Sequence, residues 1–305
     1  MRRAALAALA AAGALLVTPA AARGQTTSPA ARGANAGRAA LDSLAAESAR
    51  RTARYADRRA AVADGYRRIG ADFPGMGEHW LHPAALLAGG ADASRPTLLM
   101  YADVGGRPTL LGVGFVVTTR GDSAAPSVPG WPEAWHEHSG LLADESGARR
   151  AGVSSRGGAT RVWVLHVWTA LPNPNGPYVP DNWALPFARV GLVAPAGVDA
   201  DAGRALSLVI GGDEYLKGVL ADAGVSNARD AAAVDAALAA SQARVGVVAA
   251  RARAAGAVRT DDLAALRAEW RAIGAALRGE LGAAVDPYLA PPHSPRGASG
   301  DHHAP

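Results

Sequence analysis

Apolar residues recur at helical spacing in the first part of the chain after its N-terminal segment. Residues 39–70 contain no proline and have no glycine before Gly65. Tyr55, Val62 and Ile69 lie on one stripe of this stretch, and its other faces carry many arginines. The pattern predicts one exposed amphipathic helix that docks along its apolar side.

Two strand-like runs follow in the middle of the chain. Residues 97–104 read TLLMYADV and residues 109–119 read TLLGVGFVVTT, with GGRP between them. A short link with glycine between two apolar runs predicts a β-hairpin. In the second run Gly112 and Gly114 share one face, which predicts a bulge or a close approach by another group.

A third run, RVWVLHVWT at residues 161–169, is apolar on both faces. A strand of this kind is buried on both sides of its sheet. The run ARVGLV at residues 188–193 predicts one further strand. We therefore expect a small antiparallel β-sandwich or a partly closed barrel.

The last third of the chain returns to helical patterning. Residues 203–222 predict one or two short helices, and residues 229–255 and 261–284 each carry an apolar stripe. Thr260, followed by two aspartates, predicts the N-cap of the last helix. Two striped helices with a short link form an antiparallel hairpin. The expected fold class is α+β, with the β-region flanked by an N-terminal helix and this C-terminal hairpin.

The first 22 residues have the features of a signal peptide. A basic start, MRR, precedes an apolar run that is too short to span a bilayer, and Ala20–Ala22 offer a cleavage site. We expect an exported protein, periplasmic or secreted, cleaved near Ala22 and without a transmembrane segment. The predicted organisation is a signal peptide (1–22), a disordered linker (23–37), a helix with a His/Trp-rich β-domain (38–194), a helical region (195–285) and a disordered tail (286–305).

Composition limits the chemistry that the chain can carry. It has no cysteine, so any metal site uses His, Asp, Glu or backbone oxygen. The formal net charge is only +4, and basic residues are scattered among acids. Nucleic-acid binding favours a basic stripe, so we expect no nucleic-acid partner.

Histidines gather in the β-rich middle, each near a tryptophan. WHEH, if extended, places His136 and His138 on one face of a strand. His166 lies within an apolar strand, where a buried polar group needs a partner. His79 follows a glycine-rich turn. The predicted metal ligands are therefore His79, His136, His138 and His166, with zinc the leading ion and copper, nickel or iron as alternatives.

Neighbouring polar residues predict the rest of a site. Glu78 and Glu137 are the candidate bases toward a metal-bound water. The loop after the His166 strand, residues 171–187, offers Asn173, Asn182 and Trp183 as ligand contacts. The alternative for these three is that the asparagines shape turns and the tryptophan fills the core.

Three readings of function stay open at this point. The first is a metal-binding β-domain of unknown reaction. The second is a metal-free pocket for a small molecule or a sugar, in which the histidines only form hydrogen bonds. The third is a scaffold whose C-terminal helices bind a protein partner.

Four segments, TARYADRRAAVADGYRRI, GMGEHWLHP, WHEHSG and LHVWTALPNPNGPYVPDNWALPF, resemble a group of exported bacterial proteins of unassigned function. The shared features are a helix ending in Gly-Tyr, a Gly-Met-Gly turn reaching a histidine, and a Leu-His-x-Trp strand followed by Asn-Pro. The resemblance covers about residues 50–193. It implies one integrated domain and no particular activity.

Overall fold

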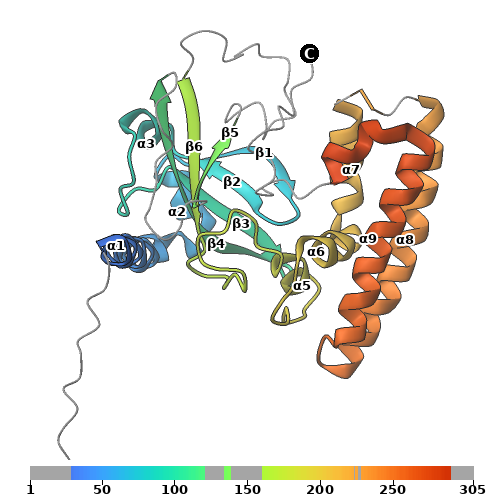
Figure 1. Ribbon diagram of the computed structural model, residues 1–305. Helices are drawn as coiled ribbons and strands as arrows, with labels where there is room; N and C mark the ends of the chain where they lie inside the picture. Colours follow the sequence, from blue (N-terminus) through green and yellow to red (C-terminus); the bar gives the residue numbers. More distant parts are fainter. Residues whose placement is uncertain (1–28, 121–133, 139–159, 223, 226–227, 290–305) are drawn as a thin grey trace, which may run out of the picture.

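The computed structural model describes residues 29–120, 134–138, 160–222, 224–225 and 228–289 (Figure 1). The predicted signal peptide and most of the predicted C-terminal tail lie outside these residues. Within them the molecule is of the α+β class, with one curled, antiparallel, six-stranded half-barrel sheet. No second sheet packs on it in the described part of the chain, so the partly closed barrel describes the fold better than the sandwich.

The single helix predicted over residues 39–70 is interrupted in the structure, and its first part begins earlier than predicted. Helix α1 (Pro29–Thr52) already begins within the predicted linker, because alanine dominates that segment. A 3-10 turn, η1 (Ala53–Ala56), follows it. Asp57 then accepts a hydrogen bond from the Arg59 N–H and starts a new helix, α2 (Arg58–Ala63). The stretch predicted as one helix is therefore three elements and the start of a strand.

Six strands form the sheet, and short turns join the first to the second and the third to the fourth. The strands are β1 (Arg67–Phe73), β2 (Gly77–Leu81), β3 (Leu98–Val104), β4 (Arg107–Arg120), β5 (Trp135–His138) and β6 (Thr160–Val167), with helix α3 (Pro83–Ala88) between β2 and β3. Their order across the sheet is β1-β2-β3-β4-β6-β5. The predicted hairpin is β3–β4, and the doubly apolar run is β6. Strands β1 and β2 fall where the sequence predicts a helix end and a turn.

Strand register separates the side chains onto two faces. Leu99, Val113 and Val167 are register partners on one face, where the core also contains Tyr101 and Phe115. Tyr55, Ala61 and Leu41 from the N-terminal helices close this core. We call this side of the sheet the tyrosine face. Leu98, Gly114 and His166 are register partners on the opposite face, which we call the histidine face.

The helical region packs as a second core. Its helices are α5 (Leu185–Arg189), α6 (Ala200–Ser207), α7 (Gly212–Asp222), α8 (Ala228–Ala255), α9 (Thr260–Leu281) and α10 (Asp286–Leu289), with 3-10 turns η2 (Leu208–Ile210) and η3 (Gly282–Val285). Helices α5 and α6 lie between the sheet and the α8–α9 hairpin in Figure 1. This core already includes Trp183 and Phe187, so it begins before the predicted boundary at residue 194.

The strand predicted at residues 188–193 is wrong. Pro186 lies in the first turn of α5, a position where a proline suits a helix. The Leu192 N–H returns to the Phe187 carbonyl, and Gly191 has a φ of 75°. These bonds turn the chain back on itself, which an extended strand cannot do.

Helix α8 passes a length-and-composition test for membrane spanning over Asp230–Ala255, with 28% of the tested window buried. Its apolar residues pack in the helical core with those of α9, for example Leu238 and Val245. An apolar core helix passes the same test, so the described residues are consistent with the absence of a transmembrane segment.

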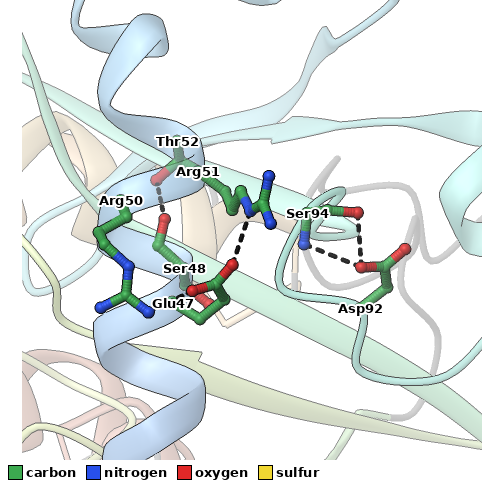
Figure 2. A network of polar contacts seen from close by, with 7 residues as sticks. All are labelled: Glu47, Ser48, Arg50, Arg51, Thr52, Asp92 and Ser94. Carbon is green, nitrogen blue, oxygen red and sulfur yellow. Dashed lines mark hydrogen bonds and ion pairs between the residues drawn. The ribbon is translucent and has the colours of Figure 1, made fainter.

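Figure 2 shows a polar network on α1 and a separate turn before β3. Glu47 pairs with Arg50 and with Arg51, whose Nε lies 2.6 Å from the carboxylate. Asp92 accepts hydrogen bonds from the Ser94 N–H and hydroxyl. These contacts are exposed and local, and such pairs add little to the free energy of unfolding. They shape the surface and offer no enclosed site.

Candidate functional site

Three chain-distant histidines meet on the histidine face. The ring of His166 lies 5.3 Å from that of His79 and 5.0 Å from that of His136, measured between ring centres. They come from β6, β2 and β5. His79 and His166 are 1% and 0% exposed, while His136 is partly buried. The predicted convergence of three separate segments therefore holds for these residues, which we call the three-histidine cluster.

Glycine on β4 makes room for the cluster. Gly114 is the register partner of His166, and a Cβ added there would lie 3.4 Å from His166 Cδ2 and 3.1 Å from Leu98 Cβ. At Gly112 an added Cβ would lie 2.4 Å from the Val167 carbonyl oxygen. The register also shifts next to it, between Met100 and Tyr101. The bare positions thus mark a bulge and a close approach, as their pattern predicts.

A backbone carbonyl fixes the protonation of His166. Its Nδ1 lies 2.9 Å from the Pro180 carbonyl oxygen. A carbonyl only accepts, so Nδ1 carries the hydrogen and the lone pair of the neutral ring belongs to Nε2. Metal-binding histidines are commonly held in this way by a carbonyl or a carboxylate. The sequence could not reveal this partner, because every residue has a carbonyl.

The asparagines of the 171–187 loop hold the loop itself. Asn173 donates to the Asp181 carbonyl and accepts from the Asn175 N–H. Asn182 donates to the Leu171 carbonyl and accepts from the Ala184 N–H. Their side chains are thereby engaged in shaping the segment that presents Pro180. This matches the turn-shaping alternative rather than direct ligand contact.

Trp183 fills the junction between the sheet and the helical core. A Cβ added at Gly75 would lie 3.2 Å from its ring, and one at Gly203 would lie 2.6 Å from it. The guanidinium carbon of Arg204 lies 5.5 Å from the ring centre. With 7% exposure, Trp183 has little surface left for a ligand.

Arg204 is a buried charge that the sequence reasoning missed. It is 8% exposed, donates to the Leu289 carbonyl at 2.6 Å, and lies over both Trp183 and Trp270. Burial lowers its pKa, and the charge of Asp181 acts in the opposite direction. Asp181 directly follows Pro180, so this charge pair links the loop that holds His166 to the helical core. No local sequence pattern distinguishes such an arginine from the exposed ones.

The structure does not bring Glu78 to the cluster. Its register partner Tyr101 belongs to the tyrosine face, and its carboxylate pairs with Arg58 at 3.2 Å and Arg68 at 3.0 Å. It also accepts from the Trp80 indole N–H. Because neighbouring strand residues point to opposite faces, a histidine at position 79 excludes Glu78 from the same site. Both guanidinium groups thus hold the Glu78 carboxylate away from the three-histidine cluster.

The remaining candidates lie at or beyond the edge of the described region. Glu137 and His138 belong to the backbone of β5, but their side chains lie outside the described residues. His82 instead caps α3, where its Nδ1 accepts from the Ala85 N–H at 3.2 Å. Among the described residues, no three or more His, Asp or Glu side chains are arranged as they would be around a metal ion. Within the three-histidine cluster, the rings of His79 and His166 instead stack, at an interplanar angle of 25°.

No protein-family model, curated protein or solved structure matches this chain. The three-histidine cluster and its surroundings are therefore the basis of the functional argument.

Proposed function

We propose that the three-histidine cluster binds one transition metal ion, with zinc the leading ion and copper, nickel or iron as alternatives. The observation that carries the proposal is the meeting of three imidazoles from β2, β5 and β6 on one buried face. Neutral imidazole nitrogens are common ligands for these ions, at about 2.0–2.1 Å. The apolar N-terminal segment supports placing this binding protein outside the cytoplasm.

The ring spacing is compatible with shared coordination. Two imidazole nitrogens bound to one ion at a tetrahedral angle put the ring centres about 5 Å apart. The two measured separations, 5.3 and 5.0 Å, are of this size. Binding requires the His79 ring, which stacks on His166, to rotate about its Cβ–Cγ bond until one nitrogen faces the ion. The Pro180 carbonyl already orients His166.

Elemental analysis and metal titration test the proposal. Full-length protein, dialysed against a weak chelator and titrated with Zn²⁺ and then Cu²⁺, should bind one ion per chain. Replacing His79, His136 or His166 by alanine should weaken binding at least 100-fold, because each change removes a ligand. His82→Asn is the matched control, since asparagine preserves the α3 cap and should leave affinity unchanged.

Two results would contradict metal binding. One is less than a tenth of an equivalent of metal on the wild-type protein after titration. The other is equal affinity in the wild type and in all three alanine variants. Either result would favour the metal-free pocket, for which the 25° stacking of two imidazoles is the supporting observation.

A further inference from the structure

A cavity of about 160 Å³ lies where the sheet meets the helical core, apart from the three-histidine cluster. Asp72 and Pro74 line it from the end of β1, and Arg189 lines it from the end of α5. The start of α7 and the turn before it supply the rest of its wall. The lining residues are Asp72, Pro74, Arg189, Ser207, Ile210, Gly211 and Gly212.

Arg189 supplies a buried cation with donor capacity to spare. Its side chain is 9% exposed, and its Nη2 lies 2.6 Å from Asp72 Oδ1. Its Nε–H is buried and has no hydrogen-bond partner among the described residues. Leaving a buried donor of a charged group unsatisfied is costly. A ligand that accepts from Nε would remove this cost.

Helix α7 begins at the same cavity, because Gly211 and Gly212 line it. The first N–H groups of a helix lack partners within the helix and attract negative charge. Gly211 has a φ of 91°, and a Cβ at Gly212 would lie 2.1 Å from Ser207 Oγ, so both positions need glycine. Asp213 and Glu214, the acids of this turn, both pair with Lys217. Lys217 lies about one turn further along α7, so these ion pairs offset the negative charge of both acids near the cavity.

The charges of the cavity match a zwitterion better than a simple ion. A carboxylate would accept from Arg189 Nε and from the α7 amides. The Asp72 side chain, 36% exposed, would accept from an ammonium group beside it. A bare anion would be repelled by Asp72, and a bare amine by Arg189. We propose that this cavity binds a small α-amino acid; about 160 Å³ suits a ligand of five or six heavy atoms, such as glycine or alanine.

Calorimetry with half-ligands tests the proposal on the wild-type, full-length chain. Glycine and L-alanine are titrated against acetate, methylamine and L-phenylalanine at one ionic strength, after chelator treatment so that bound metal plays no part. Glycine and alanine should bind at least tenfold more tightly than either half-ligand, because only they satisfy both charges. Phenylalanine should bind more weakly than alanine, because its larger side chain must extend beyond the roughly 160 Å³ beside the charged groups.

Variants locate the binding. Asp72→Asn should weaken glycine binding at least tenfold without weakening acetate binding, since only the ammonium partner is lost. Arg189→Gln should abolish binding of both. Arg267→Gln is the control, because Arg267 also pairs with an aspartate, Asp199, at 2.6 Å but lies outside the cavity lining.

Three results would overturn the amino-acid site. They are acetate binding as tightly as glycine, no heat of binding for any ligand, and an Asp72→Asn variant that binds glycine like the wild type. The first two results are measured on the wild-type protein, so the proposal can be contradicted even if the Asp72→Asn variant does not fold. None of them bears on metal binding, which is measured separately.

Discussion

Gly112 illustrates how the absence of one side chain shapes the histidine face. Its α-carbon lies where the Val167 carbonyl oxygen and the Met100 methyl group approach β4. A Cβ at position 112 would force the backbone of β6 at Val167 to move, and backbone gives way less easily than the end of a flexible side chain. The position therefore constrains how β4 and β6 pair next to His166.

Gly112→Ala should destabilise the protein by about 2–3 kcal/mol, because the added carbon would lie 2.4 Å from a backbone oxygen. Chemical denaturation monitored by tryptophan fluorescence measures the change. The matched control is Gly218→Ala in α7, where an added Cβ meets nothing within 4 Å. That change should stabilise the protein by about 0.5–1 kcal/mol. Equal stability of the two variants would contradict the close-approach role of Gly112.

At this scale the sequence predicted the histidines better than their partners. A histidine inside an apolar strand needs a hydrogen-bond or metal partner. The convergence of His79, His136 and His166 could therefore be expected from the sequence. Glu78 lies on the opposite face from His79, as the alternation of side chains along β2 implies. The Pro180 carbonyl and the Arg204 charge carry no sequence signal, since their roles depend on which segments fold together.

At the scale of elements, the start of α9 shows an acid in a structural role. The sequence places the N-cap at Thr260, but the cap is Arg259 and the stabilising acid is Asp262. Its carboxylate accepts from the Arg259 N–H at 2.9 Å and from the Arg251 guanidinium at 2.8 Å. The Arg259 N–H first, and the Arg251 side chain second, lower the pKa of Asp262.

Asp262→Asn should destabilise the protein by about 1–2 kcal/mol at pH 7, because a charged acceptor of three hydrogen bonds, two from Arg251 and one from Arg259, becomes neutral. The folded pKa lies below the ordinary value, so this contribution is present above about pH 4 and is lost as the pH falls through the folded pKa. Urea midpoints of variant and wild type, measured from pH 7 to pH 3, should converge at the acid end. Asp261→Asn, an exposed neighbour, should change stability by less than about 0.5 kcal/mol.

Element types were predictable where patterns were long and regular. The β3–β4 hairpin, β6 and the α8–α9 pair follow from period and length. Strands β1 and β2 were missed for physical reasons. Strand β1 is an edge strand in which only Phe73 is buried, with arginines and Gly70 in place of an alternating apolar face. The identity of β2 depends on pairing with β3 rather than on its own glycine-rich lead-in.

At the scale of the whole molecule, buried tyrosines attach the N-terminal helices and the 171–187 loop. Tyr101 donates to the Tyr55 carbonyl at 2.6 Å, and Tyr66 donates to the Pro96 carbonyl at 2.8 Å. Tyr178 donates to Asp42 of α1 at 3.1 Å. Burial raises the pKa of Tyr66, Tyr101 and Tyr178 above the ordinary value. Their hydroxyls therefore stay protonated to a higher pH than the hydroxyl of an exposed tyrosine.

The protein should unfold cooperatively at alkaline pH. Because the folded pKa of each tyrosine is raised, its contribution is complete below about pH 10 and is lost above it, at up to about 1.4 kcal/mol per pH unit. Near-ultraviolet absorbance of tyrosinate and far-ultraviolet circular dichroism, recorded together, should change in one step. Tyr178→Phe should make the loss of stability with pH shallower. Ionisation of all six tyrosines well before the loss of helix signal would contradict this coupling.

The position of β6 in the sheet has a consequence for how the chain reaches this structure. Four strands, β1 to β4, pair in the order in which they occur, and each can form from local contacts. Strand β6 instead inserts between β4 and β5, which both precede it. Closing that long loop is entropically slow compared with turning a hairpin. We therefore expect His79 to take its place on an early meander, and His166 to join it later, when β6 pairs with β4.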